Sequence, residues 1–116
     1  MKKEIESRLI SLSVKVRSIA GELIRDPSFK SLADQLIRSS SSAALNYGEV
    51  QSAESTKDFI HKCSIVLKEL RETSIGLRII DQSSTRMNVD IRNIINDCNH
   101  LTAILQKTVN TSKSKL

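Results

Sequence analysis

Apolar residues recur every three or four positions through four long segments of the chain, a spacing typical of amphipathic α-helices. The first segment stops at Asp26-Pro27, because proline lacks an amide hydrogen and disfavours helix at the residue before it. Its predicted core positions are Ile5, Leu9, Leu12, Val16, Ile19 and Leu23.

The second predicted helix begins between Ser28 and Ser31 and contains a run of four serines, Ser39–Ser42, with poor helix propensity. A linker is the alternative, but apolar positions at helical spacing continue on both sides of the run. We therefore predict a helix whose small side chains let a neighbouring helix come close. Gly48 should end this helix or lie in its last turn. The predicted core positions are Leu32, Leu36, Ile37, Ala43, Ala44 and Tyr47.

The third predicted helix begins at Ser55-Thr56-Lys57-Asp58, a capping-box pattern, and breaks at Asp81-Gln82-Ser83-Ser84. Its predicted core positions are Phe59, Cys63, Val66, Leu70, Thr73, Leu77 and Ile80. Those of the fourth helix are Met87, Ile91, Ile94, Cys98, Leu101, Leu105 and Thr108. A polar stretch begins at Asn110, and we divide the chain into a bundle over 1–112 and a flexible basic tail over 113–116.

Four helices with short connections predict an all-α fold, an antiparallel up-down-up-down four-helix bundle. Only 3 glycines and 1 proline occur among 116 residues, too few for the turns of an all-β protein. Several apolar residues lie beside the predicted core positions, which indicates either a wide core face or a subunit interface. They are Ile10, Val14, Ile24, Ile60, Leu67, Ile95 and Ile104.

Several short motifs between Asp34 and Arg78 occur in an order and spacing that resemble one family. They are Asp34-Gln35-Leu36-Ile37-Arg38-Ser39, Ala44-Leu45-Asn46-Tyr47-Gly48-Glu49, Ala53-Glu54-Ser55-Thr56-Lys57-Asp58-Phe59-Ile60-His61-Lys62, Leu67-Lys68-Glu69-Leu70-Arg71-Glu72-Thr73 and Leu77-Arg78. The family is that of the bacterial four-helix-bundle proteins encoded inside intervening sequences of 23S ribosomal RNA genes, also labelled S23 ribosomal proteins. Gly76 departs from the family, which tends to carry an aromatic residue at that position.

The resemblance covers most of the chain and implies an antiparallel bundle that assembles into a ring-shaped homopentamer. The family is also similar to the accessory variability determinants of diversity-generating retroelements, basic helical rings that bind a reverse transcriptase and nucleic acid. Neither group is associated with an enzymatic activity.

The charge balance favours an anionic partner, since 18 Lys and Arg residues outnumber 13 Asp and Glu residues, for a net charge of +5. The third helix carries a ridge at intervals of three and four residues, two positions from the core residues and hence on the opposite face. The ridge consists of Lys57, His61, Ser64, Lys68, Arg71, Ile75 and Arg78. It either follows a phosphate backbone or is an ordinary solvated face, with Glu69 and Glu72 beside it.

The candidate nucleic-acid-binding residues are therefore Lys57, His61, Lys68, Arg71 and Arg78. A polar set in the family motifs has the simpler role of fixing helix register: Arg38, Asn46, Glu69 and Glu72. If the second hairpin turns near Ser52, Arg38 lies close to Glu69 and forms an ion pair between helices. Tyr47 is predicted to lie in the core or an interface, and aromatic content of 3% argues against a protein that stacks bases.

No catalytic or metal-binding motif occurs in the sequence, and we expect no enzymatic activity, cofactor or metal. Cys98 and His100 lie two residues apart on a helix and point to nearly opposite faces, so they cannot form a dyad. In the predicted hairpin, Cys98 is level with about residue 69, and its offset from Cys63 is about 9 Å along the axis. This exceeds the Cα separation of about 7 Å that a disulfide allows, so both thiols should stay reduced and buried.

These features together predict a cytoplasmic, non-enzymatic, nucleic-acid-associated homo-oligomer, which binds structured RNA through backbone contacts. The alternative is a scaffold whose surface docks another protein and does not bind nucleic acid. We expect no membrane association, because no stretch approaches the roughly 18 apolar residues that span a bilayer.

Overall fold

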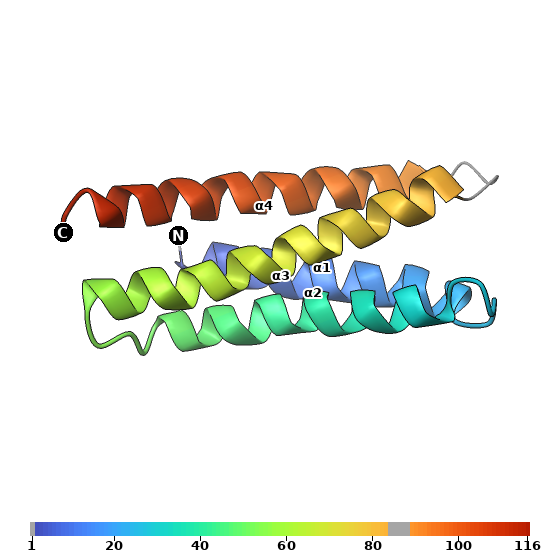
Figure 1. The fold of residues 1–116 in the computed structure, drawn as a ribbon, viewed down its shortest axis with the longest axis horizontal. Helices are drawn as coiled ribbons and strands as arrows, with labels where there is room; N and C mark the ends of the chain where they lie inside the picture. Colours follow the sequence, from blue (N-terminus) through green and yellow to red (C-terminus); the bar gives the residue numbers. More distant parts are fainter. Residues whose placement is uncertain (1, 84–88) are drawn as a thin grey trace.

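Four α-helices make up nearly all of the computed structural model, which describes residues 2–83 and 89–116 (Figure 1). They are α1 (Lys2–Leu23), α2 (Lys30–Val50), α3 (Thr56–Ser83) and α4 (Val89–Lys113). No strand occurs in the described ranges, and the predicted all-α fold is confirmed. Met87, a predicted core residue, and Ser84, the end of the predicted break, lie outside the described residues.

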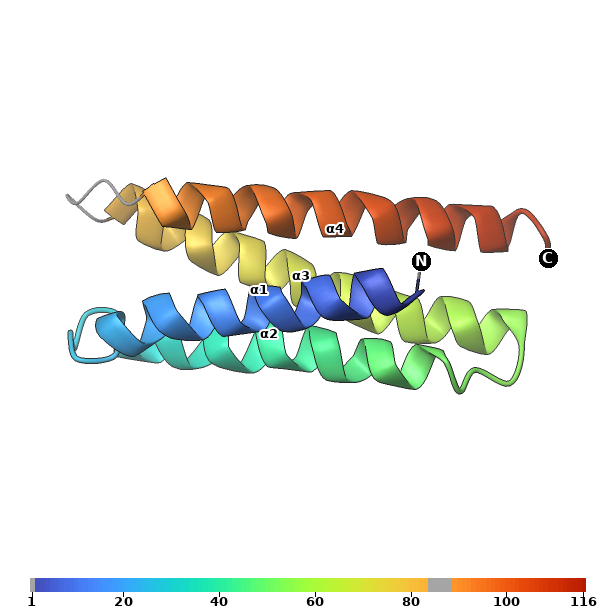
Figure 2. The ribbon, with the colours of Figure 1, turned by 180° about the vertical axis from the view of Figure 1, so that it is seen from behind.

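Each helix packs against the next along the chain, and α1 meets α4 to complete the bundle. Figures 1 and 2 show the antiparallel, up-down-up-down course, with both termini at the same end of a rod. The rod measures 48 × 20 × 19 Å. The α1–α4 contact is the sparsest of the four, whereas α2 and α3 share the most extensive one. The α2–α3 pair is therefore the best-packed part of the bundle.

The serine run of α2 is helical, as predicted, and two of its serines face the core. Ser39 and Ser40 are 2% and 0% exposed. The Ser39 and Thr73 hydroxyl oxygens lie 2.7 Å apart across the α2–α3 interface. Thr73 directs its own proton to the Glu69 carbonyl oxygen at 2.9 Å, and the alternative acceptor of Ser39, the Leu36 carbonyl oxygen, is farther away at 3.4 Å. This arrangement favours Ser39 as the donor of the bond between the helices. Small side chains thus allow the close approach that the sequence predicted.

The start of α3 is capped as predicted. The Asp58 amide donates to the Ser55 hydroxyl at 3.0 Å, and the Asp58 carboxylate accepts from the Glu54 amide at 3.1 Å. A bond from Lys62 at 2.7 Å is the main reason that the pKa of Asp58 is lowered. The bounds of α2 agree with the prediction, since the helix begins at Lys30 and Gly48 lies in its last turn.

Two predicted helix ends are wrong. The helix α3 does not break at Asp81 but continues to Ser83. The carboxylate oxygen of Asp81 lies 3.7 Å from Nε of Arg92 on α4. The helix α4 likewise includes Asn110, where the sequence analysis began a polar tail, and runs to Lys113. Both segments are polar, and helical periodicity alone could not show that the helix continues through them.

The core contains most of the predicted positions, but Leu32, Ile37 and Ala44 of α2 are only half-buried. Leu23 and Phe59 are half-buried, as is Thr108, while the neighbouring Val109 is buried instead. Steps of three and four residues average 3.5 per turn, whereas a straight α-helix has 3.6, so the core position drifts by one residue along α4. Leu67 also joins the core, which makes the core face of α3 wide.

The two cysteines confirm the predicted register of α3 against α4. Both are free thiols in the core, and Cys98 donates to the carbonyl oxygen of Leu70 at 3.2 Å, close to the predicted level of residue 69. Burial raises the pKa of the Cys63 thiol and raises that of Cys98 to about 12. The long side chain of Arg71 of α3 also reaches Gln106 of α4.

Replacing Thr73 with valine keeps the side-chain shape and removes the hydroxyl that accepts the proton of Ser39. We expect the free energy of unfolding to fall by about 1–2 kcal/mol, because a buried hydroxyl loses its partner. In a double-mutant cycle with Ser39→Ala, urea denaturation should give a coupling energy of about 1 kcal/mol. Additive effects of the two substitutions would contradict a bond between these helices.

Stability should fall as the pH rises from about 9 to about 12, because the unfolded chain releases the Cys98 proton in this range and the folded chain retains it. The contribution of this thiol is fully present below its ordinary pKa of 9.0. Unfolding of wild type and Cys98→Ala, measured by denaturant titration at several pH values, tests this. The difference in unfolding free energy should narrow with rising pH, and parallel profiles would contradict the expectation.

Candidate nucleic-acid interface

The predicted ridge lies along the outside of α3. All seven of its side chains, from Lys57 to Arg78, are exposed. They point away from the core because they follow the core residues by two positions. The ridge is thus a continuous surface strip along one helix. We call it the α3 ridge.

The carboxylates of α3 lie on its other side, toward α2. Arg38 of α2 reaches Glu72 at 3.1 Å and Glu69 at 3.5 Å, which confirms the predicted ion pair between these helices. Glu69 is the more buried of the two, and its side chain is 10% exposed. The two acidic residues beside the ridge, Glu69 and Glu72, therefore neutralise Arg38.

Four cations of the α3 ridge make no ion pair with any residue in the described ranges: Lys57, Lys68, Arg71 and Arg78. Some cations elsewhere are matched, as Lys15 is by Asp97 at 3.2 Å and Lys62 is by Asp58 at 2.7 Å. The α3 ridge is therefore a row of cations without carboxylate partners in the described ranges.

The side of α4 that faces α3 adds carboxamides to this strip. Asn99 accepts a hydrogen bond from Ser74 at 3.0 Å, and Gln106 accepts one from Arg71 at 3.0 Å. Gln106 in turn donates to Asn110 at 3.1 Å. We call the α3 ridge together with Asn99, Gln106 and Asn110 the basic face.

The acidic residues of α4 face away from the basic face. Asp97 binds Lys15 of α1, and Asp90 borders a hollow that Lys15 also lines. The contribution of α4 was not predicted, because the spacing of charges on the third helix alone does not show which residues of α4 lie beside it. The sequence contains a signal for this arrangement of α4. Asp90 and Asp97 are seven residues apart, as are Asn99 and Gln106. A spacing of seven keeps the two members of each pair on one side of a helix.

The two histidines have separate surroundings. His61 is exposed on the α3 ridge, and His100 faces α1, where its Nδ1 lies 3.1 Å from the guanidinium of Arg8. Arginine is always protonated, so this nitrogen is the acceptor. Cys98 is buried while His100 is exposed, which confirms that they form no dyad. Within the described ranges, no group of three or more His, Cys, Asp or Glu side chains is arranged to hold a metal ion.

The remaining polar and aromatic predictions have simple structural outcomes. Asn46 donates to the Ser42 carbonyl and hydroxyl oxygens at 2.8 and 2.9 Å, so it bonds within α2 and joins no second helix.

Tyr47 is buried, as predicted, and burial is the main cause of its raised pKa. Phe29 and Phe59 are half-buried against the core. The one tyrosine and two phenylalanines of the chain therefore leave no fully exposed ring.

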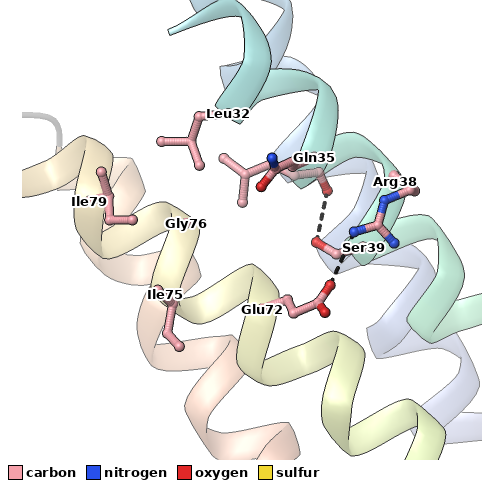
Figure 3. A pocket seen from close by; sticks show the side chains of 9 residues that line it. Leu32, Gln35, Arg38, Ser39, Glu72, Ile75, Gly76 and Ile79 are labelled. Atoms are coloured by element: carbon pink, nitrogen blue, oxygen red, sulfur yellow. Dashed lines mark hydrogen bonds and ion pairs between the residues drawn. The ribbon is translucent and has the colours of Figure 1, made fainter.

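A groove of about 410 Å³ lies between α2 and α3 and borders the α3 ridge at Ile75 (Figure 3). Leu32 and Leu36 of α2 line it together with Ile75 and Ile79 of α3, and the Arg38–Glu72 ion pair borders it. Gly76 lies in this groove, and a Cβ atom there would come within 2.7 Å of Leu36. The absence of a side chain at Gly76 thus lets Leu36 occupy this space.

The spare apolar residues divide between the two predicted roles. Leu67 is buried in the core, and Ile60, Ile95 and Ile104 pack partly buried against it. Ile10 and Val14, in contrast, are 50% and 61% exposed. Leu45, Ile75 and Ile79 are also exposed and were not among the predicted flanks. No helix in the described part of the chain is long and apolar enough to cross a membrane.

A rod of four antiparallel helices with a basic face along two of them defines a helical-bundle protein with an exposed row of cations on α3. Comparison with known families is more specific: residues 2–107 match the family described as 23S rRNA-intervening sequence protein. The chain belongs to this family.

A solved structure from Bacteroides thetaiotaomicron has the same fold, with a TM-score of 0.82 and 24% sequence identity. It covers 90% of this chain and 97% of its own, and it is described as a protein of unknown function from the S23 ribosomal protein family. None of the proteins with curated descriptions matches this chain.

Proposed function

We propose that this protein is a non-enzymatic, nucleic-acid-associated protein that binds structured RNA through the phosphate backbone. The observation that carries the proposal is the basic face, where Lys57, Lys68 and Arg78 lack carboxylate partners among the described residues. Unpaired cations in a row attract a polyanion and release its counterions on binding. A cytoplasmic location agrees with two reduced, buried thiols.

The aromatic residues support a base-paired target rather than an unpaired strand. Proteins that bind single strands stack bases on exposed rings, and here Tyr47 is buried while Phe29 and Phe59 pack against the core. The α3 ridge instead offers charge at fixed positions along a straight helix. Phosphate contacts of this kind position a protein on a duplex and carry little sequence information.

Charge reversal on the α3 ridge tests the proposal. Lys68→Glu with Arg71→Glu should weaken binding to duplex RNA about tenfold or more, with similar losses for different RNA sequences, because phosphate contacts are removed. The dependence of log affinity on log salt should become shallower by about 2. Fluorescence anisotropy titrations at several salt concentrations measure both quantities.

Arg17→Glu with Arg25→Glu is the matched control, because it changes the net charge equally on α1 and the loop after it. Its affinity should change far less than that of the ridge variant. Circular dichroism should be unchanged for both, since all four side chains are exposed. If the wild type binds neither RNA nor DNA at low salt, the proposal is overturned. If both variants lose affinity equally, the α3 ridge is not the binding surface.

We also propose that the chain is a homo-oligomer, with a pentamer as the expected size. Ile10, Val14 and Leu45 on α1 and α2 are exposed by 50%, 61% and 73%, and Ile75 and Ile79 on α3 are also exposed. So many exposed aliphatic side chains on a small bundle favour burial between copies.

Light scattering at micromolar concentration should give a mass several times the 12.9 kDa of one chain. Val14→Glu with Leu45→Glu should reduce this mass, because a subunit interface does not tolerate unpaired buried carboxylates. A wild-type mass of one chain would contradict the homo-oligomer, while the RNA experiment would still test the basic face of a monomer.

The groove between α2 and α3 favours a second candidate function, a scaffold that docks a protein. Its exposed Ile75 and Ile79 would contact an apolar segment of that partner. Such a complex should survive moderate salt, whereas the RNA complex should weaken steeply as salt rises. Salt-resistant capture of a protein partner, together with no binding of RNA, would favour the scaffold over the RNA-binding function.

A further inference from the structure

Two arginines on opposite sides of α3 are held by different kinds of acceptor. Arg38 bonds to the carboxylates of Glu72 and Glu69 at 3.1 and 3.5 Å. Arg71 bonds to the neutral carboxamide of Gln106 at 3.0 Å. A carboxylate holds an arginine and cancels its charge, whereas a carboxamide holds the side chain and leaves the charge in place.

A second hydrogen bond fixes the orientation of Gln106. Its amide nitrogen donates to the Asn110 side-chain oxygen at 3.1 Å, while its oxygen accepts from Arg71. Exchanging the amide oxygen and nitrogen would place two donors together at Arg71, so only one orientation satisfies both contacts. Gln106 is half-buried between the helices, and Arg71 and Asn110 are exposed. The row Asn110–Gln106–Arg71 is therefore an ordered network on the surface.

The guanidinium of Arg71 keeps most of its hydrogen-bonding capacity in this network. It has five N–H donors, and the bond to Gln106 uses one of them. Arginine recognises phosphate best when two parallel N–H groups are presented in a fixed direction. A neutral acceptor that restrains the side chain lowers the conformational entropy lost when a phosphate binds.

We propose that Gln106 is a positioning residue that holds Arg71 ready for a backbone phosphate of duplex RNA. This inference rests on the proposed function of the basic face. It extends the site from α3 to α4, because the residues that orient the cation lie on the second helix. A purely structural role, in which the bond only joins α3 to α4, is the competing explanation.

The substitution Gln106→Glu separates the two roles, because it keeps the shape and the acceptor atom but adds a negative charge beside Arg71. It should convert the hydrogen bond into an ion pair, so thermal stability should be unchanged or higher. Affinity for duplex RNA should fall about three- to tenfold, and the salt slope should become shallower by about one, since one cation is neutralised. A structural role predicts unchanged RNA binding, because the contact between the helices is retained.

Gln35→Glu on α2 is the matched control, as it makes the same chemical change at an exposed position beside the α2–α3 groove. It should change RNA affinity less than twofold. In an Arg71→Ala background, Gln106→Glu should leave the salt slope unchanged, because the cation that it neutralises is absent. Gln106→Ala gives an independent test: it should weaken binding two- to threefold with Arg71 present and have no effect without it.

The outcomes distinguish this inference from the function on which it depends. If wild type does not bind duplex RNA, the proposed function fails. If wild type binds and Gln106→Glu binds equally well with the same salt slope, the role of Gln106 is overturned and the proposed function stands. An effect of Gln106→Ala that persists in the Arg71→Ala background would also overturn the positioning role.

Discussion

The close contact between α2 and α3 is the constraint on which the rest of the structure depends. It is made by small side chains, with Ser39 donating to Thr73 at 2.7 Å and Gly76 leaving room for Leu36. This contact sets the rotation of α3 about its own axis. Once that rotation is set, Glu69 and Glu72 face Arg38 of α2, and the ridge cations must lie on the outer side and toward α4.

The separation of charge across α3 follows from this rotation. The same helix carries cations and carboxylates in nearly alternating order, and a sequence with that composition is typical of an ordinary solvated helix. The fold sorts them, because a neighbouring arginine on α2 takes up two carboxylates while α4 offers carboxamides to Arg71 and Ser74 of α3. A modest net charge of +5 thereby becomes a local basic strip.

Membership in the 23S rRNA-intervening sequence protein family agrees with the helical rod, and the solved Bacteroides structure shows how well this fold is retained at 24% identity. The likeness concerns the fold, whereas the contacts that define the basic face are those of this chain. Part of its apolar surface has a different distribution, because Ile10, Val14 and Leu45 are exposed on α1 and α2 and not on the two helices of the basic face. Self-association through that surface and RNA binding through α3 and α4 would therefore be compatible on one rod.

The sequence by itself determined the four helices, most of the core and the register of α3 against α4. Helical periodicity is a local property, and Cys98 lies beside Leu70 because two helices joined by a short connection align by residue count. The same counting correctly paired Arg38 with Glu69. These predictions needed only the spacing of residues and the approximate positions of the turns.

The residues that lie beside the α3 ridge, and the last residues of the polar ends of α3 and α4, could be seen only in the tertiary structure. Helix rotation depends on contacts between helices, so the bond of Gln106 to Arg71 could not be read from either helix alone. The helix α3 extends to Ser83, and Asp81 in this last turn lies 3.7 Å from Arg92 of α4, a contact between helices that the sequence pattern does not show. Val109 replaced Thr108 in the core because a helix has 3.6 residues per turn and the sequence pattern averages 3.5. This small difference in rotation per residue accumulates along a helix, and packing against the neighbouring helices determines which residue faces the core.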